Sequence, residues 1–249
     1  MTALLASVNN PAEARIALDA GVDVIDLKNP TAGALGAVAD PVAREIVAQV
    51  AGRVPVSATI GDLPLAHAGV VRAVRNKAAT GVDYVKVGLF GEGAAGALSA
   101  LQPLAEDGVQ LVAVLFADRG IDLTLLHALA KAGFTGAMVD TAGKHAGCLR
   151  RHADQELLRG FVDLCREMGL LSGLAGSLDI TDIAPLLELT PDLLGFRGAL
   201  CRRGQRTDVL DWQAIAAVRK RIPLEDGTAP PAISTRNGDG LLRHSRTAR

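Results

Sequence analysis

The sequence has few aromatic residues, little net charge and no long apolar run, and each absence excludes a class of partner. Aromatic residues make up 3% of the 249 residues, so the stacking platforms used by single-strand nucleic-acid binders are lacking. The formal net charge is −1, with both signs spread along the chain, which also argues against a nucleic-acid partner. No apolar stretch reaches the roughly 18 residues of a membrane span. We therefore expect neither nucleic acid nor membrane as a partner.

Cysteine and histidine are also sparse. Cys148, Cys165 and Cys201 are widely separated, and no histidine pair at ligand spacing lies near them, so we expect reduced structural or surface thiols. None of the five histidines pairs with a carboxylate at metal-ligand spacing, and we predict no metal. The segment after Met1 lacks the basic flank, apolar region and cleavage site of a signal peptide, so we expect a cytoplasmic protein.

Eight short runs rich in β-branched residues alternate with longer amphipathic segments, which is the period of a ring of βα units. Apolar residues stand at consecutive positions in these runs, as in parallel strands covered on both faces. The length suits one TIM barrel, so the pattern predicts the α/β class and a single (β/α)8 barrel. The expected strands are residues 3–8, 23–27, 54–60, 83–88, 110–116, 136–140, 170–175 and 193–196, and the expected helices lie near 11–20, 40–51, 64–79, 94–106, 122–132, 154–168, 180–189 and 211–221.

The barrel pattern stops after residue 222. Glycine, asparagine and threonine are scattered through the segment that follows, and four of the final fourteen residues are arginine. We expect a catalytic barrel domain over residues 1–222 and a disordered basic tail over residues 223–249. We also expect a homo-oligomer.

Asp26 and Lys28 stand two residues apart at the end of the second expected strand. Side chains alternate along a strand, so both should point into the barrel near its carboxyl end. Burial disfavours the charged amine, and the neutral amine is the nucleophile that forms a Schiff base. Asp26 could hold that amine or move its protons. A purely structural Asp–Lys pair is the alternative.

Further candidates follow the fourth and sixth strands, where Lys86 repeats the strand-end arrangement and Asp140 ends the strand. Two lysines in one mouth raise the cost of protonating each other, so one can be neutral while the other acts as an acid or a clamp. Lys86 taken singly also suits a phosphate contact. Lys144 could reach back over the mouth, although a surface ion pair with Asp140 is equally open.

Glycine-rich segments follow the seventh and eighth strands, which is the usual phosphate-binding quarter of this fold. Gly176 and Gly198 would let backbone amides approach an anion, Ser177 can donate a hydrogen bond, and Arg197 can bind two phosphate oxygens. Simple tight turns are the alternative. We therefore predict a phosphorylated substrate, with a flexible loop at residues 33–36 closing over the mouth.

In combination these motifs resemble the (5-formylfuran-3-yl)methyl phosphate synthase family, also called 4-(hydroxymethyl)-2-furancarboxaldehyde-phosphate synthase. The resemblance rests on DLKNP with GALGA, SATIGD, YVKVGL, MVDTA-x-K, LAGS and G-x-RGA-x-C, in order over residues 3–205. It implies a TIM-barrel lyase that joins two molecules of the triose phosphate glyceraldehyde 3-phosphate into a phosphorylated furan aldehyde. That product is the first furan precursor of methanofuran, and the resemblance implies no metal or organic cofactor.

The resemblance also implies roles for particular residues. Lys28 would form the Schiff base and Lys86 would donate and accept protons, with Asp26, Asp140 and Lys144 as matching active-site positions. The basic extension beyond the barrel departs from the family and affects none of these positions.

Three other activities share some of these features. A D-x-K decarboxylase would carry a second aspartate three residues after Lys28, where this chain has Thr31. A class I aldolase usually takes its imine lysine from strand 6, where this chain has Asp140. A non-catalytic phosphosugar-binding barrel would keep the phosphate quarter but has no use for two inward lysines.

Overall fold

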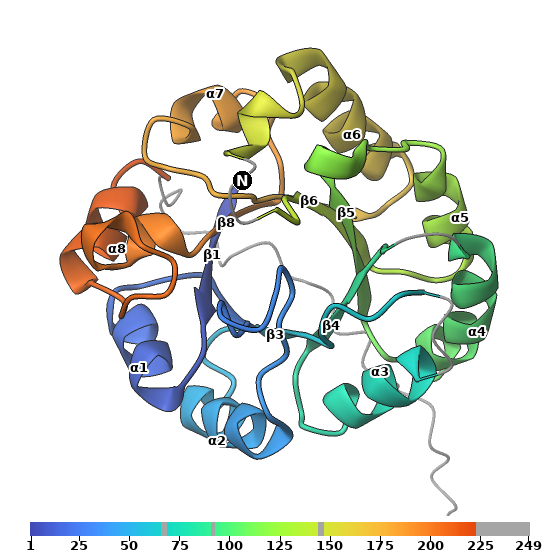
Figure 1. The fold of residues 1–249 in the computed structure, drawn as a ribbon, viewed down its shortest axis with the longest axis horizontal. Coiled ribbons are helices and arrows are strands. Elements are labelled where there is room, and N and C mark those ends of the chain that lie inside the picture. The colour runs from blue at the N-terminus through green and yellow to red at the C-terminus, as the bar shows by residue number, and fades with distance from the viewer. Residues whose placement is uncertain (66–68, 91–92, 144–146, 223–249) are drawn as a thin grey trace, which may run out of the picture.

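Eight parallel strands form a closed ring in the computed structural model, with the helices around it (Figure 1). The structure describes residues 1–65, 69–90, 93–143 and 147–222. The strands pair in sequence order, and β8 (Leu193–Phe196) closes the ring on β1 (Ala3–Val8). The predicted (β/α)8 barrel is confirmed. The predicted tail, residues 223–249, lies outside the described residues, and the homo-oligomer stays a prediction.

The elements follow the predicted alternation, with most ends trimmed by a few residues. The remaining strands are β2 (Val24–Leu27), β3 (Val56–Thr59), β4 (Tyr84–Gly88), β5 (Leu111–Phe116), β6 (Gly136–Asp140) and β7 (Leu171–Leu174). The α-helices are α1 (Pro11–Asp19), α2 (Asp40–Val50), α3 (Val70–Ala78), α4 (Ala94–Glu106), α5 (Leu125–Lys131), α6 (Gln155–Glu167), α7 (Ile183–Leu187) and α8 (Trp212–Arg219). Short 3-10 turns are η1 (Ala117–Arg119), η2 (Leu149–Arg151), η3 (Gly198–Leu200) and η4 (Arg202–Gly204).

Local side-chain chemistry sets several helix starts. Asn10 caps α1, because its side chain accepts a 2.9 Å hydrogen bond from the Glu13 amide. Asp122 was expected to start a helix, but α5 begins later, at Leu125. The Asp122 carboxylate instead accepts bonds from the amide and hydroxyl of Thr124, which forms a turn before the helix.

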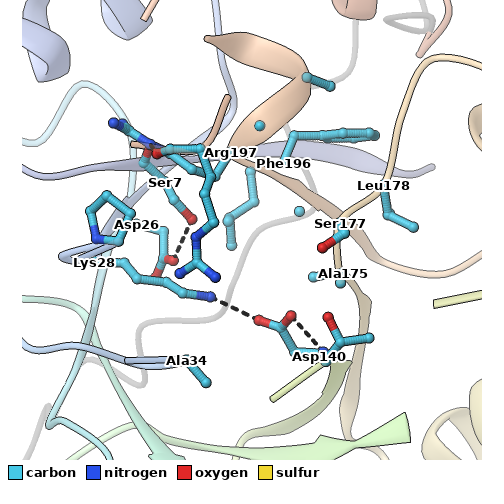
Figure 2. A pocket seen from close by; sticks show the side chains of 18 of the residues that line it. Ser7, Asp26, Lys28, Ala34, Asp140, Ala175, Ser177, Leu178, Phe196 and Arg197 are labelled. Carbon is cyan, nitrogen blue, oxygen red and sulfur yellow. Dashed lines mark hydrogen bonds and ion pairs between the residues drawn. The ribbon is translucent and has the colours of Figure 1, made fainter. Parts of the chain in front are cut away.

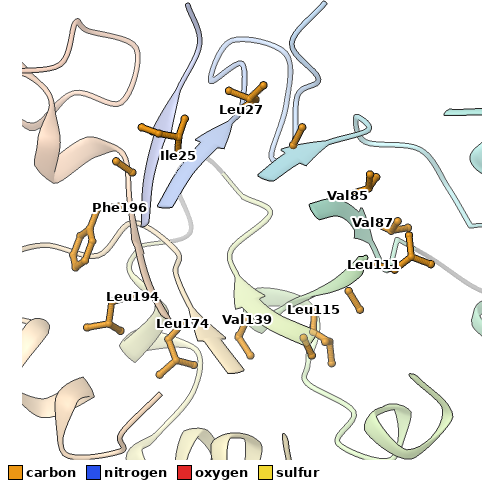
Figure 3. Packing of buried hydrophobic residues seen from close by; sticks show 14 of the residues in the cluster. Ile25, Leu27, Val85, Val87, Leu111, Leu115, Val139, Leu174, Leu194 and Phe196 are labelled. Atoms are coloured by element: carbon orange, nitrogen blue, oxygen red, sulfur yellow. The ribbon is translucent and has the colours of Figure 1, made fainter. Parts of the chain in front are cut away.

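Alternation along the strands sorts side chains into two apolar layers. In β2, Ile25 and Leu27 lie on the outer side with the helix-facing core (Figure 3), whereas Val24 belongs to the cluster inside the barrel. In β4, Val85 and Val87 likewise belong to the outer layer (Figure 3). The intervening positions, which include the two polar candidates of these strands, therefore face the barrel interior.

The three cysteines are free thiols, in line with the expected reduced structural or surface thiols. Cys165 is buried in the helix-facing core, and burial raises the pKa of its thiol to about 12. Burial likewise raises the pKa of the Cys201 thiol to about 11. No helix in the described ranges is long and apolar enough to cross a membrane.

One buried ion pair ties the first strands to the last helix, away from the polar residues that follow the strands. The Asp23 carboxylate accepts a 2.6 Å hydrogen bond from the Leu4 amide and a 2.5 Å bond from Arg219 of α8. Asp23 also donates its own amide to the Leu4 carbonyl at 3.0 Å. This carboxylate therefore joins β1, the start of β2 and α8.

Replacing Asp23 with alanine should lower the free energy of unfolding by about 3 kcal/mol, because it leaves a buried amide unsatisfied and a largely buried guanidinium unpaired. Urea unfolding of the purified variant measures this. Asp163→Ala is the matched control, since Asp163 also pairs with an arginine but is 49% exposed, and its loss should cost less than about 0.5 kcal/mol. Equal losses in the two variants would contradict the assignment.

Candidate active site

A cavity of about 330 Å³ opens at the carboxyl ends of the strands. Its wall is contributed by β1, β2, β4, β6 and β8 and by loops that include the one after β7. Eight of the nine residues predicted from the sequence line it, while Lys144 lies outside the described residues. The eight are Asp26, Lys28, Lys86, Asp140, Gly176, Ser177, Arg197 and Gly198.

At the base of this cavity, Asp26 is held by three donors. Lys86 lies 2.8 Å from one carboxylate oxygen, and the hydroxyl of Ser57 donates to the same oxygen at 2.7 Å. Ser7 donates to the other oxygen at 2.9 Å (Figure 2). Ser7, Asp26 and Ser57 face one another in the strand register, so neighbouring strands present them at one level. The side chain of Asp26 is 1% exposed.

The charge state of Asp26 follows from these contacts. Burial raises the pKa of a carboxyl group, but the charges of Lys86 and Lys28, with hydrogen bonds from Lys86 and Ser57, outweigh it here. The pKa of Asp26 therefore lies below its ordinary value of 3.8. Asp26 is a fixed anion that holds a buried ammonium in place.

Lys28 and Asp140 meet across the mouth of the barrel. The Lys28 Nζ lies 2.8 Å from an oxygen of Asp140, and both side chains are 13% exposed (Figure 2). The second oxygen of Asp140 accepts the Thr141 amide at 2.7 Å. Their strands, β2 and β6, stand on opposite sides of the ring. The amine end of Lys28 therefore reaches into the space a substrate would occupy.

The pairing differs from the simplest reading of the sequence. Asp26 and Lys28 both face the cavity as predicted, but the carboxylate in contact with Lys28 belongs to Asp140, and Asp26 contacts Lys86. Closeness in sequence suggests the wrong partner for Lys28. In the closed barrel its amine reaches Asp140 on β6, while Asp26 pairs with Lys86 on β4. The hypothesis that Asp26 holds the Lys28 amine is corrected accordingly.

The loop after β2 is fastened by a carboxylate from the loop after β3. Asp62 accepts the amides of Ala34 and Leu35 at 2.8 and 2.6 Å. Gly33, with a φ of +113°, passes so close that a Cβ there would collide with the Asp62 carboxylate. Ala34 and Leu35 are buried in the apolar cluster inside the barrel. The loop at residues 33–36, which was predicted to close over the mouth, therefore already packs against the barrel interior in this structure.

The loop after β6 is fastened in the same way from the loop after β5. Asp118 accepts the amides of Ala142 and Gly143 at 2.8 and 2.7 Å. Burial acts to raise the pKa of Asp118, but these two hydrogen bonds prevail and the pKa lies below 3.8. Asp118 therefore fixes the segment that directly follows Asp140. The sequence marks it only as one polar residue among several after the strands.

The loop after β7 approaches the loop after β6 closely. Gly176 has a φ of +109°, and a Cβ there would lie 3.0 Å from the Thr141 amide. Ser177 follows in the left-handed region with a φ of +49°, and it lines the cavity as an exposed residue. A non-glycine residue held in that region is strained, and such strain gathers at binding sites.

Arg197 lies at the cavity wall (Figure 2), but its donors are already used. Two of its N–H groups bind the Glu13 carboxylate at 2.5 and 3.0 Å. The others donate to the carbonyls of Ser7, Arg206 and Asp208 at 3.1, 2.9 and 2.9 Å. A guanidinium has five donors, so none is left to bind phosphate as the sequence predicted. Arg197 therefore has a structural role and links β1, α1 and the segment at residues 206–208.

The structure also bears on a metal site. Within the described ranges no three His, Cys, Asp or Glu side chains gather closely enough to hold a metal ion.

Thr31, which stands where a D-x-K decarboxylase would have its second aspartate, is exposed, and its amide and hydroxyl both bind the Asn29 side chain.

Comparison with known proteins identifies the family. The family model for 4-HFC-P synthase matches residues 4–219. The chain belongs to this family. A protein of Methylorubrum extorquens is 43% identical over 87% of this chain and 91% of its own length. Two 4-HFC-P family relatives are named (5-formylfuran-3-yl)methyl phosphate synthase. The one from Methanopyrus kandleri is 39% identical over 82% of this chain and 91% of its own length, and the one from Methanosarcina acetivorans is 37% identical over 83% and 93%.

Solved structures show that this member of the 4-HFC-P synthase family shares a widespread fold. Phosphoribosyl anthranilate isomerase from Thermus thermophilus matches with a TM-score of 0.63 and 13% identity over 89% of this chain and 98% of its own. A 3-hexulose-6-phosphate synthase matches with a TM-score of 0.60 and 15% identity over 87% and 99%. At such identities the likeness shows the barrel fold alone.

Replacing Asp118 with asparagine should flatten the acid side of the stability profile. A carboxyl group whose folded-state pKa is lowered contributes stability above its unfolded-state pKa, and that stability is lost as pH falls through the folded-state pKa. The free energy of unfolding of the wild type should therefore fall more steeply than that of Asp118→Asn from about pH 4.5 downwards. Urea unfolding at constant ionic strength measures both slopes. Parallel curves would show that Asp118 does not hold the loop as a carboxylate.

Proposed function

We propose that this protein is a (5-formylfuran-3-yl)methyl phosphate synthase, a lyase that condenses two molecules of glyceraldehyde 3-phosphate. The product would be the phosphorylated furan aldehyde from which methanofuran is built, formed without an organic cofactor. Family membership over nearly the whole length of the relatives supports the reaction. The observation that carries the mechanism is the Lys28 amine, 2.8 Å from Asp140, in a cavity with a second buried lysine.

The contacts of the two lysines favour Lys28 as the nucleophile. Lys86 is 5% exposed and bound to a carboxylate that two serine hydroxyls also hold, so its nitrogen has little freedom. Lys28 is more exposed, and its nitrogen lies over the cavity beside Asp140. An aldehyde entering the mouth therefore meets the Lys28 nitrogen with a proton acceptor next to it.

Imine formation follows from that pair. Asp140 accepts a proton from the Lys28 ammonium, and the neutral amine attacks the aldehyde carbon of one triose phosphate. The new carbon–nitrogen bond breaks the π bond of the carbonyl, and a proton passes from the nitrogen to the resulting alkoxide oxygen to give a carbinolamine. Asp140 then returns its proton to the carbinolamine oxygen, which leaves as water while the nitrogen lone pair forms the imine. The Lys28 nitrogen and the Asp140 carboxylate lie within hydrogen-bond distance of each other before the aldehyde enters.

The carbon–carbon bond requires a second proton carrier. Removal of a proton from the carbon next to the imine gives an enamine, and that carbon attacks the aldehyde of the second triose phosphate. Lys86 supplies and accepts protons for this exchange, while the Asp26 carboxylate holds its nitrogen in place. Cyclisation, dehydration and loss of one phosphate as inorganic phosphate follow, and hydrolysis of the imine releases the product and frees the Lys28 amine. Formation of the aromatic ring makes the sequence irreversible.

Reduction with sodium borohydride tests the imine assignment. Incubation with glyceraldehyde 3-phosphate and borohydride should add one triose phosphate to the chain irreversibly, because reduction converts the imine to a stable secondary amine. Peptide mapping by mass spectrometry should place the adduct on Lys28, and Lys28→Ala should abolish it.

An adduct on a different lysine, or none, would contradict the assignment. The same incubation without borohydride should produce furan absorbance and release phosphate. Furan formation without a trapped adduct would keep the reaction and overturn the imine mechanism.

Replacing Lys86 with arginine should lower kcat by about 100-fold or more, since arginine keeps the charge but gives up a proton that can be transferred. Steady-state rates of furan formation measure this, and triose phosphate binding should survive. Lys77→Arg is the matched control, because Lys77 is also a buried lysine, paired with Asp40 and the Val38 carbonyl away from the cavity. Near-normal turnover of Lys86→Arg would reduce Lys86 to a charge clamp.

A further inference from the structure

Four cationic side chains line the described wall of the cavity: Lys28, Lys86, Arg197 and Arg206. The first three each have a carboxylate partner, as described above. Within the described part of the chain, Arg206 has no carboxylate at ion-pair distance. The wall therefore carries one positive charge that the protein leaves without a counter-charge there.

Arg206 also keeps most of its donors available. One N–H donates to the Gly33 carbonyl at 3.1 Å, and this is the one hydrogen bond that its guanidinium makes to the described residues. A guanidinium has five N–H donors in a planar fork that matches two oxygens of a phosphate. The half-buried side chain is thus anchored at one edge while its remaining donors stay unused.

The loop that carries Arg206 is built as a hairpin. Cys201 and Leu210 pair in an antiparallel bridge at its base, and the Arg202 amide donates to the Val209 carbonyl at 3.0 Å. The chain reverses at Gly204, which has a φ of +70°. The position of the loop is therefore fixed by backbone pairing on both sides of the turn.

Arg197 fixes this hairpin to the barrel. Its guanidinium donates to the carbonyls of Arg206 and Asp208 in the hairpin while its other donors bind Glu13 and Ser7. Arg197 and Arg206 therefore have different roles. Arg197, which the sequence nominates for phosphate, holds the backbone, and that backbone presents Arg206 to the cavity.

We propose that Arg206 binds the phosphate group of a triose phosphate substrate. This rests on the proposed function for the identity of the ligand, since two triose phosphates would bring two phosphate dianions into one cavity. A guanidinium fork can bind two oxygens of such a group. Through its bond to the Gly33 carbonyl, Arg206 also joins the bound phosphate to the loop that follows Lys28. Phosphate recognition and the position of the imine lysine are connected through one side chain.

Binding of glycerol 3-phosphate tests this proposal, because that ligand has the phosphate but no carbonyl and cannot form an imine. Isothermal titration calorimetry on the full chain should show binding by the wild type and about tenfold or greater weakening in Arg206→Ala. Arg206→Lys should fall between them, because it keeps the charge and loses the fork. Arg203→Ala is the matched control on the same hairpin. Arg203 is 78% exposed and paired with Asp208, and its loss should leave affinity within about twofold.

Wild-type affinity in Arg206→Ala, an equal loss in Arg203→Ala, or no binding by the wild type would overturn the proposal. If Arg206→Ala unfolds at the assay temperature, Arg206→Lys decides the matter on the same scale. The furan assay separates this result from the proposed function. Loss of glycerol 3-phosphate binding in Arg206→Ala, with no furan formed by the wild type, supports Arg206 and contradicts the reaction. Unchanged glycerol 3-phosphate binding in Arg206→Ala, with furan formed by the wild type, supports the reaction and contradicts the role of Arg206.

Discussion

The interior of this barrel depends on pairing each buried lysine with a carboxylate. An ammonium taken out of water costs several kcal/mol unless an anion and further hydrogen bonds replace the solvent. Asp26 supplies that anion to Lys86, and Asp140 supplies it to Lys28. Because the second pair spans the mouth between β2 and β6, the same interaction that makes the lysines tolerable also places an amine and a carboxylate where a substrate must pass.

The two loops that adjoin the mouth-spanning pair of Lys28 and Asp140 are held by the same kind of contact. Asp62 binds two successive amides of the loop after Lys28, and Asp118 binds two successive amides of the loop after Asp140. In each case the carboxylate comes from the loop that follows an adjacent strand. A carboxylate that accepts paired backbone amides fixes both the position and the orientation of a loop. Chemistry that needs an amine and an acid at hydrogen-bond distance depends on such support.

Charge is distributed unevenly around the cavity. The base and the mouth-spanning pair are neutral as pairs, while the side formed by the loop after β8 presents Arg206. A phosphorylated aldehyde would therefore meet a positive end for its phosphate and a lysine nitrogen for its carbonyl. Under the proposed function, this separation of a charge-binding side and a reacting side would orient the substrate.

Much of this protein is already specified by local sequence pattern. Consecutive apolar residues in eight short runs, separated by amphipathic segments, require a covered parallel sheet, and polar residues at the strand ends mark one mouth. Strand alternation alone places Asp26 and Lys86 inward. These features follow from the spacing of apolar and polar residues along the chain, which does not depend on tertiary contacts.

The partners of those residues depend on closure of the ring and could not be read from the chain. The sequence places Lys28 beside Asp26, but contact between β2 and β6 loops gives it Asp140, 112 residues away. Arg197 has the right residue type and the right loop for phosphate, yet the carbonyls of a later hairpin and Glu13 take all its donors. Which charges are satisfied within the protein, and which remain for a ligand, is settled by long-range packing, because hydrogen-bond partners are chosen by distance in space.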